Sequence, residues 1–166
     1  FMVVFETILD ALKWCKNVQQ QLIEAEWPQE ILNSPICAPV YDSDGTILYS
    51  GLSVRMGIHY GMAINEQDIV TRRMDYFGVE VITASRICDA ALGGQIIVTA
   101  AVYNMAQEIV ATSGENLDLA FFEIGATKLK GIENFEVVYA VYPSALAGRF
   151  NQQEFAILPS EPPSRL

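Results

Sequence analysis

The residue types best suited to chemistry lie in the segment 72–86, which carries a carboxylate, a glycine and an arginine in close succession. Asp75 is expected on a loop that enters a helix through Gly78, and Arg86 lies two turns into that helix. Ile82 and Arg86 are one helical turn apart, so they share a face. A carboxylate accepts hydrogen bonds from a base, and a guanidinium donates a fork of them to phosphate. The pattern suits a nucleotide, although this spacing alone is a weak signal.

Each of these side chains also has an ordinary structural interpretation. An isolated aspartate is more often an acid of a loop or of a helix N-terminus, without any ligand, and an exposed helix arginine often forms an ion pair. Arg72 and Arg73 would face solvent, a partner subunit or a substrate. The single histidine, His59, falls within a strand pattern, which favours a structural role.

Apolar periodicity and turn residues predict the elements that precede this segment. Residues 1–5 are short, apolar and rich in β-formers, which predicts a buried strand. Thr7 followed by Asp10 resembles a capping box, and apolar residues at three- and four-residue steps then predict a helix that ends before Pro28. Prolines and an Asp-Ser-Asp-Gly turn predict an inserted hairpin over about 28–51.

After the insert, alternation predicts a strand over 52–61, followed by a loop over 62–74 and the helix at about 79–91. Gly93-Gly94 is expected to end that helix in a left-handed cap. The remaining expected elements are a strand at 95–98, a short helix at 100–110, a polar loop at 111–119 and a closing pair of strands made from the segments 121–124, 128–131 and 136–142. This order indicates an α+β sandwich with helices against one sheet. Residues 1–145 would form the domain, and 146–166 a proline-containing tail or linker.

Composition excludes several classes of protein. The chain has 166 residues, of which 51% are hydrophobic and 18% charged, so it has the length of about one domain and material for a core. A net charge of −10 disfavours non-specific binding to nucleic acid or an anionic membrane. Three widely spaced cysteines and one histidine argue against a zinc site. No apolar run approaches the ~20 residues of a transmembrane segment.

Taken as a whole, the segment 72–98 resembles the class III nucleotidyl cyclases, the family of adenylyl and guanylyl cyclases. That family carries D-x-x-G-x-x-V-N-x-A-x-R, followed by G-G-Q-I-x-[VM] in the next strand. This chain matches every fixed position except one, because Ile82 stands where the family has asparagine. Residues 54–61 also match the family pattern [VL]-R-[MIV]-G-I-H-x-G. The insert and residues 70–76 look like the fungal-type adenylyl cyclases, and the resemblance covers 1–22 and 52–143.

The resemblance implies a ferredoxin-like βαββαβ fold whose first strand and part of a hairpin are missing from this chain. It implies conversion of ATP to 3′,5′-cyclic AMP and diphosphate in intracellular signal transduction, by a homodimer whose subunits share each active site. Mg²⁺ or Mn²⁺ would be the cofactor, with its ligands upstream of Phe1, so this chain by itself is expected to be inactive. The expected location is the cytoplasm, or the cytoplasmic face of a membrane if the rest of the parent protein anchors it there.

The resemblance also assigns roles to single residues. Asp75 would select the base, Arg86 would stabilise the developing phosphate charge, and Lys130, or Lys128 if the register differs, would contact the polyphosphate. Ile82 replaces the asparagine that orients the ribose, and isoleucine cannot form that hydrogen bond. Losing one preorganised polar contact typically costs ~10²–10³ in rate. Two alternatives remain: a degenerate cyclase-like domain that serves as dimer partner or nucleotide-binding regulator, which Ile82 favours, and an unrelated ferredoxin-like binding module.

Overall fold

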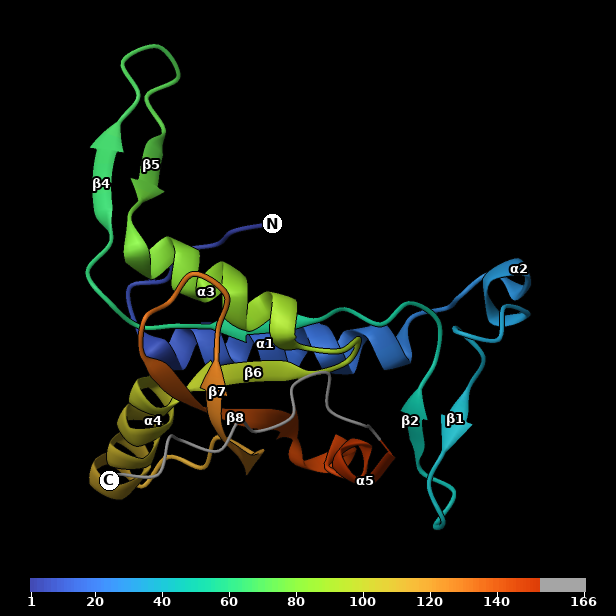
Figure 1. Ribbon diagram of the computed structural model, residues 1–166. Coiled ribbons are helices and arrows are strands. Elements are labelled where there is room, and N and C mark those ends of the chain that lie inside the picture. The colour runs from blue at the N-terminus through green and yellow to red at the C-terminus, as the bar shows by residue number, and fades with distance from the viewer. Residues whose placement is uncertain (153–166) are drawn as a thin grey trace.

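A four-stranded sheet with helices packed on it forms the body of the chain in this computed structural model, which describes residues 1–152 (Figure 1). The strand order is β3-β6-β8-β7. Strand β3 runs parallel to β6, while β8 pairs antiparallel with both β6 and β7. The strands span Met56–Ile58 (β3), Ile96–Thr99 (β6), Leu119–Lys128 (β7) and Phe135–Pro143 (β8).

Alternate residues of the sheet build two separate cores, as the period of two in a strand requires. Ile96 and Val98 of β6 pack on one face with α1 and α4, whereas Ile97 packs on the other face with α3. The helices span Ile8–Glu24 (α1), Val79–Ala90 (α3) and Ala100–Ser113 (α4). The predicted α+β sandwich is therefore confirmed, and its helices cover both faces of the sheet.

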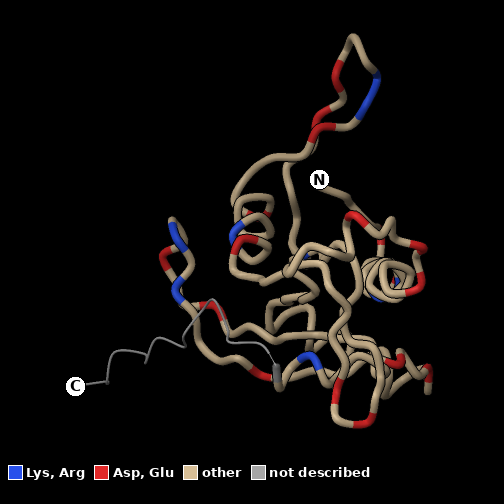
Figure 2. The backbone as a smooth tube through the Cα atoms, turned by 90° about the vertical axis from the view of Figure 1, so that its right-hand side faces the viewer, with Lys and Arg blue, Asp and Glu red and all other residues tan. Residues whose placement is uncertain are grey.

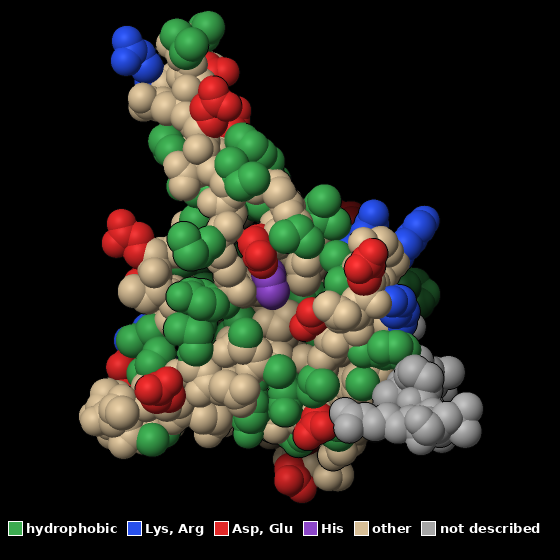
Figure 3. Space-filling view, turned by 60° about the vertical axis from the view of Figure 1, so that its left-hand side comes forward, with side chains coloured by type: hydrophobic (Ala, Val, Ile, Leu, Met, Phe, Trp, Pro, Cys, Tyr) green, Lys and Arg blue, Asp and Glu red, His purple; other side chains and the backbone are tan. Residues whose placement is uncertain are grey.

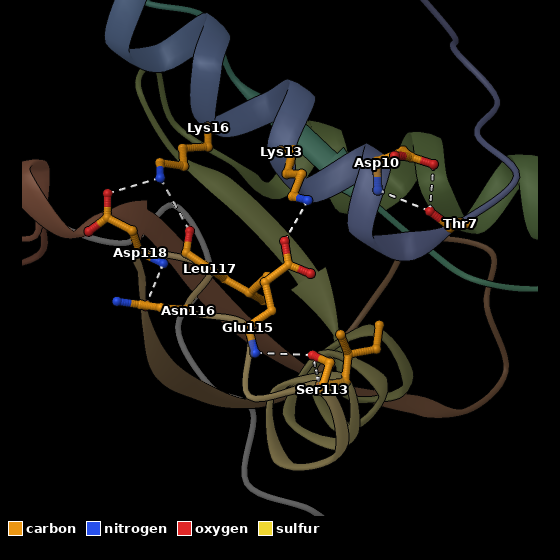
Figure 4. Close-up of polar contacts among 10 residues, drawn as sticks. Thr7, Asp10, Lys13, Lys16, Ser113, Glu115, Asn116, Leu117 and Asp118 are labelled. Atoms are coloured by element: carbon orange, nitrogen blue, oxygen red, sulfur yellow. Dashed lines mark hydrogen bonds and ion pairs between the residues drawn. The ribbon is translucent and has the colours of Figure 1, made fainter.

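Helix α1 begins at the capping box that the sequence predicts. Thr7 Oγ1 accepts a hydrogen bond from the backbone N–H of Asp10 at 3.1 Å, and its hydroxyl donates to Asp10 Oδ2 at 2.6 Å (Figure 4). These bonds satisfy one of the amide groups that have no partner within the first turn of a helix. The helix ends at Glu24, before Pro28, as predicted.

Two ion pairs attach α1 to the loop that follows α4. Lys13 Nζ lies 2.6 Å from Glu115 Oε1, and Lys16 Nζ lies 2.9 Å from Asp118 Oδ2 (Figure 4). The hydrogen bond from Lys16 is the largest influence on Asp118, and it lowers the pKa of that carboxyl. The packing of α1 beside α4 is thus reinforced at the surface by charge.

The insert at 28–51 contains the predicted hairpin, together with a short helix that the sequence did not indicate. The elements are α2 (Gln29–Leu32), β1 (Val40–Tyr41) and β2 (Ile47–Tyr49). The turn is closed by Asp42 Oδ1, which accepts hydrogen bonds from the backbone N–H groups of Asp44 and Thr46, each at 2.9 Å. Leu48 of β2 is completely buried, so the insert is attached to the body by an apolar contact.

The predicted loop at 62–74 is wrong, because this stretch and the next residues form a projecting hairpin, which we call the arm (Figure 1). Strands β4 (Ile64–Gln67) and β5 (Met74–Phe77) pair antiparallel, and Asp75 therefore lies in a strand rather than a loop. Both faces of β4 are exposed. The hydrophobic alternation that identifies a half-buried strand is consequently missing from its sequence. The arm carries acidic and basic positions along its length (Figure 2).

The N-terminal prediction is also wrong. Residues 1–5 form no strand, and Met2, Val3 and Val4 are each more than half exposed. A strand needs a neighbour for its backbone groups, and no described strand pairs with these residues.

The end of α3 differs in detail from the prediction. The residue after its last turn is Ala91, in an extended conformation, rather than Gly93 or Gly94. Gly94 does have a positive φ of 83°, but it lies in the turn into β6, where its N–H donates to Val54 O at 3.0 Å. Strand β7 likewise ends at Lys128, so residues 129–131 belong to a turn and not to a strand.

Residues 146–150 are buried or partly buried, although the sequence predicts a tail or linker from 146. The chain passes here from a 3₁₀ turn (Ser144–Leu146) into α5 (Arg149–Gln152). Arg149 is only 2% exposed and donates to Leu48 O at 2.7 Å, Gln19 Oε1 at 2.8 Å and Gly94 O at 2.9 Å. Burial lowers the pKa of its guanidinium. One side chain therefore joins the C-terminal segment to α1, the insert and the turn after α3; the predicted tail beyond 152 lies outside the described residues.

Candidate active site

Two residues of the predicted motif, Ile82 and Arg86, lie on one accessible face of α3, whereas Asp75 lies in β5. Val79, Ile82, Arg86 and Asp89 follow one another at three- and four-residue steps, which places them along a single stripe. Val79 is 60% exposed and Ile82 50%, while the opposite face of the helix is buried against the sheet. Ile82 and Arg86 thus share an accessible face, as predicted from their spacing.

Two glycines allow this helix to lie where it does. A Cβ atom at Gly57 of β3 would be 2.4 Å from the backbone nitrogen of Cys88, so only glycine permits this close contact between strand and helix. Gly78, which precedes the first turn, has a φ of 107° that side chains rarely tolerate. The helix that carries Arg86 is therefore held against β3 near one end and joined sharply to the arm at the other.

Arg86 is partly exposed and lies beside a carboxylate. Its Nη1 is 3.4 Å from Asp89 Oδ2, and its Nε is buried without a hydrogen-bond partner in the described structure. Arg55 approaches the same carboxylate from the residue before β3, with Nη2 3.3 Å from Asp89 Oδ1. The ordinary interpretation, an exposed helix arginine in an ion pair, therefore describes this geometry correctly. The pair is long, however, since charge-assisted bonds are usually ~2.7–2.9 Å.

Asp75 is exposed on the arm and lies directly opposite Glu66 in the β4–β5 pairing. Opposite residues of an antiparallel pair project on the same side, so the two carboxylates are neighbours. Both line an open pocket of about 390 Å³ on the arm, together with apolar residues such as Ile69, Val70 and Phe77. A carboxylate beside apolar surface can accept a hydrogen bond from a ring amino group while the ring covers the apolar atoms.

Lys130 lies exposed in the turn between β7 and β8, and within the described residues its ammonium group takes part in no hydrogen bond or ion pair. Lys128, the alternative if the register differs, is already occupied: its Nζ donates to Glu133 O and lies 5.5 Å from the centre of the Phe135 ring. Of the two lysines, Lys130 is therefore the one available to an anionic ligand. Whether it contacts one stays a prediction.

Asp75, Arg86 and Lys130 come from three elements, and no hydrogen bond or ion pair within residues 1–152 joins any two of them. The turn that carries Lys130 is nevertheless attached to α3, because Leu129 and Ile132 pack in the same core as Ile87. The arm pocket contains Asp75 but neither of the cations. None of the three is buried in apolar packing, so all remain available for a ligand.

His59 has the structural role that its strand pattern favours. Its Nε2 lies 2.6 Å from Glu80 Oε2, and its Nδ1 lies 3.4 Å from Thr99 Oγ1. Figure 3 shows the histidine at the centre of its face of the molecule, below the arm, with an acidic side chain above it. Glu80 also fills the space over Gly61, where a Cβ atom would lie 2.2 Å from Oε2. This contact fastens the first turn of α3 to the ends of β3 and β6.

Sequence reasoning missed the partners of these residues. Asp89 follows Arg86 by three positions, and that helical spacing was a signal that could have indicated the pair. Glu66 is nine residues before Asp75, so only the register of the hairpin shows that the two are opposite. Arg55 and Glu80 pair with residues of other elements, for which local spacing carries no signal.

The donor set of the described residues does not fit a metal centre. Within residues 1–152, no three or more histidine, cysteine, aspartate or glutamate side chains are grouped so that they could hold an ion. These residues can therefore bind, orient and stabilise charge on a nucleotide, but they do not form the Mg²⁺ or Mn²⁺ site that the resemblance implies.

Comparison with known proteins agrees with the motifs. Residues 1–141 match the adenylate and guanylate cyclase catalytic domain. The adenylate cyclase of Podospora anserina is 42% identical over 176 residues, which cover 90% of this chain and 8% of that protein. The adenylate cyclase of Schizosaccharomyces pombe is 40% identical over 167 residues, which cover 92% of this chain and 10% of that protein. The chain thus spans about a tenth or less of these curated relatives.

A solved structure of adenylate cyclases from Trypanosoma brucei in their monomeric state resembles the fold with a TM-score of 0.69. The match covers 93% of this chain and 70% of that one at 24% identity, so it concerns the fold alone. Together these findings define a class III cyclase fold. The chain belongs to the adenylate and guanylate cyclase catalytic domain family, and the predicted likeness to fungal adenylyl cyclases is confirmed. Within the described region, no helix has the length and apolar character needed to cross a membrane.

Proposed function

We propose that this chain supplies the base-selecting and phosphate-stabilising half of an adenylyl cyclase active site, which converts ATP to 3′,5′-cyclic AMP and diphosphate in intracellular signalling. The observation that carries the proposal is the exposed face of α3. It presents Arg86 to solvent, and the arm that enters the helix through Gly78 presents Asp75. Such a reaction would take place in the cytoplasm or at the cytoplasmic face of a membrane.

The reaction is an in-line attack of the ribose 3′-oxygen on the α-phosphorus, in which a new P–O bond forms and diphosphate leaves. Negative charge develops on the phosphoryl oxygens and on the leaving oxygen, so catalysis requires positioning and charge stabilisation. Arg86 would donate its planar fork to these oxygens. Lys130 would bind the polyphosphate as a point charge. A bound Mg²⁺ or Mn²⁺ would supply further charge neutralisation, with ligands that are not among the residues described.

Asp75 would select adenine over guanine. An ionised carboxylate only accepts hydrogen bonds, so it pairs with the adenine 6-amino group and repels the guanine 6-oxygen. A binding site rejects the wrong base strongly when binding that base would leave a buried polar group of the site without a hydrogen-bond partner. The apolar residues Ile69, Val70 and Phe77 that share the pocket with Asp75 could cover the face of a purine.

A second subunit would complete the site. Large apolar side chains are exposed along the arm and continue onto α3: Ile64, Ile69, Val70, Met74, Phe77, Val79 and Ile82. Exposed apolar side chains gathered in this way mark an interaction site, and their position beside Asp75 and Arg86 in the chain would place the nucleotide at the subunit boundary. We therefore propose a homodimer in which each active site takes residues from both chains.

The second candidate function is that of a degenerate cyclase domain that binds a partner or a nucleotide without turning ATP over. Ile82 favours it, since its exposed hydrocarbon occupies the position of the asparagine that orients the ribose in the family and offers no hydrogen bond. The two functions differ in whether a composite site containing Ile82 makes cyclic AMP.

Complementation tests the proposal. The chain is mixed with the catalytic domain of the Podospora anserina enzyme in which the residue aligned with Arg86 is replaced by alanine, so that only a site using Arg86 of this chain is complete. We expect cyclic AMP to form with the wild-type chain and to be abolished by Arg86→Ala. Complex formation is followed by size-exclusion chromatography. Formation of the complex without any cyclic AMP would favour the degenerate domain, and activity that survives Arg86→Ala would exclude Arg86 from the mechanism.

A further inference from the structure

Asp89 is held between two guanidinium groups, and each takes a different oxygen of its carboxylate. Arg55 Nη2 lies 3.3 Å from Oδ1, and Arg86 Nη1 lies 3.4 Å from Oδ2. Asp89 is also the last member of the exposed stripe on α3, one turn beyond Arg86. The carboxylate is therefore the nearest charged group to the guanidinium that the proposed function assigns to the phosphate.

The position of Asp89 is set from the sheet as well as from the helix. Arg55 Nη1 lies 3.4 Å from the backbone oxygen of Asp89, so the Arg55 fork spans both the main chain and the side chain of that residue. Arg55 immediately precedes β3, whose Gly57 packs directly on the backbone of Cys88. The strand thus places a guanidinium beside the carboxylate before any substrate is present.

Arg86, in contrast, is fixed at only one end by the protein. Its Nε is buried and lacks a partner in the described structure, while its Nη1 reaches Asp89 over a long contact. A flexible arginine tip needs a partner to be held in one orientation, because ordering such a side chain costs conformational entropy. A long, half-exposed ion pair is worth little. Asp89 can therefore aim the tip without competing strongly with a phosphate group.

We propose that Asp89 is a positioning residue that aims the Arg86 guanidinium toward the nucleotide phosphates, and that Arg55 anchors Asp89 and neutralises its charge. Without Arg55, a carboxylate on this face would repel a polyphosphate. With Arg55 present, the group formed by Arg55, Arg86 and Asp89 carries a net positive charge that a phosphate can approach. The inference rests on the proposed function for its catalytic meaning, but the positioning itself can be measured on the chain alone.

Side-chain NMR of the ¹⁵N-arginine-labelled chain measures the positioning without reference to activity. Signals are assigned with single Arg→Lys variants. We expect Asp89→Asn to shift the Arg86 and Arg55 signals and to increase the rotation rate of both guanidinium groups several-fold. The buried Arg149, with its three hydrogen bonds, serves as the internal reference and should not change. An Arg86 signal that is indifferent to Asp89→Asn would overturn the proposal, whatever the outcome of the cyclase assay.

Kinetics in the complementation assay measure the catalytic consequence. Asp89→Asn should lower kcat about tenfold, as misplacement of a catalytic group does, while KM for ATP changes less than twofold. Repeated in an Arg86→Lys chain, the same substitution should have no further effect, because Asp89 acts through Arg86. Glu115→Gln, which removes the exposed Lys13–Glu115 pair on α1, is the matched control and should leave kcat unchanged. An equal loss of kcat from Asp89→Asn in the wild-type and Arg86→Lys chains, or a rise in kcat, would refute the positioning role.

Discussion

Replacing Ile82 by asparagine would restore the one position of the motif at 75–86 where this chain differs from the family, and its effect can be estimated from the structure. Ile82 is 50% exposed on a helix whose other face carries the packing, so the substitution removes only part of a buried side chain. Full burial of an isoleucine is worth ~1.5–3 kcal/mol, and the difference in helix propensity is a few tenths of a kcal/mol. A loss of stability of about 1 kcal/mol is therefore expected, too small to unfold the domain.

The catalytic gain should be larger than this cost. One preorganised hydrogen bond in an active site is worth ~10²–10³ in rate, and the exposed position of Ile82 leaves room for a ribose to approach. We expect Ile82→Asn to raise turnover in the complementation assay by about tenfold or more. Val79→Asn, one turn earlier on the same exposed face, removes apolar surface without supplying the contact and should give no gain. If the two variants behave alike, the ribose is held in another way and the reasoning about Ile82 is wrong.

Three further predictions concern other parts of the chain. Asp75→Asn, which converts one acceptor oxygen into a donor, should reduce the preference for ATP over GTP about tenfold in the same assay; an unchanged ratio would show that Asp75 does not read the base. Arg149→Met would leave the oxygens of Leu48, Gly94 and Gln19 without the guanidinium donor, so urea unfolding should show that the free energy of unfolding falls by about 3 kcal/mol or more. A change near zero would mean that this buried guanidinium does not join the C-terminal segment to the body. The Lys16 contact lowers the pKa of Asp118 in the folded state, so the contact stabilises the fold above the unfolded pKa of ~3.9 and loses this effect as the pH falls through the lower folded pKa. The difference in melting temperature between wild type and Asp118→Asn should therefore be largest near pH 7 and vanish well below pH 4. A difference that does not depend on pH would contradict this linkage.

Elements with one buried face could be predicted from the sequence. The capping box at Thr7 and Asp10 and the apolar periodicity of α1 located that helix, and the alternation through Met56 and Ile58 located β3. The arm escaped prediction because Ile64 to Gln67 are exposed on both faces and carry no alternation. The burial of Arg149 was not predicted, because nothing in the neighbouring sequence distinguishes an arginine that a turn buries from one that remains in solvent.

The candidate site was predictable only in part, for a similar reason. The types and spacing of Asp75, Ile82 and Arg86 are local, and the helix places the last two on one face as expected. Two of their charged neighbours, Glu66 and Arg55, come from pairings for which local spacing carries no signal. Glu66 is brought opposite Asp75 by the hairpin register, and the Arg55–Asp89 pair forms where strand and helix cross.

The most direct test of the account is a crystal structure of this chain in complex with the Podospora anserina catalytic domain and a non-cyclisable ATP analogue. We predict that the Asp75 carboxylate lies within hydrogen-bond distance of the adenine amino group, and that Arg86 and Lys130 contact the phosphates of the same nucleotide at the subunit boundary. A nucleotide bound elsewhere, or a complex in which these three side chains point to different surfaces, would contradict it.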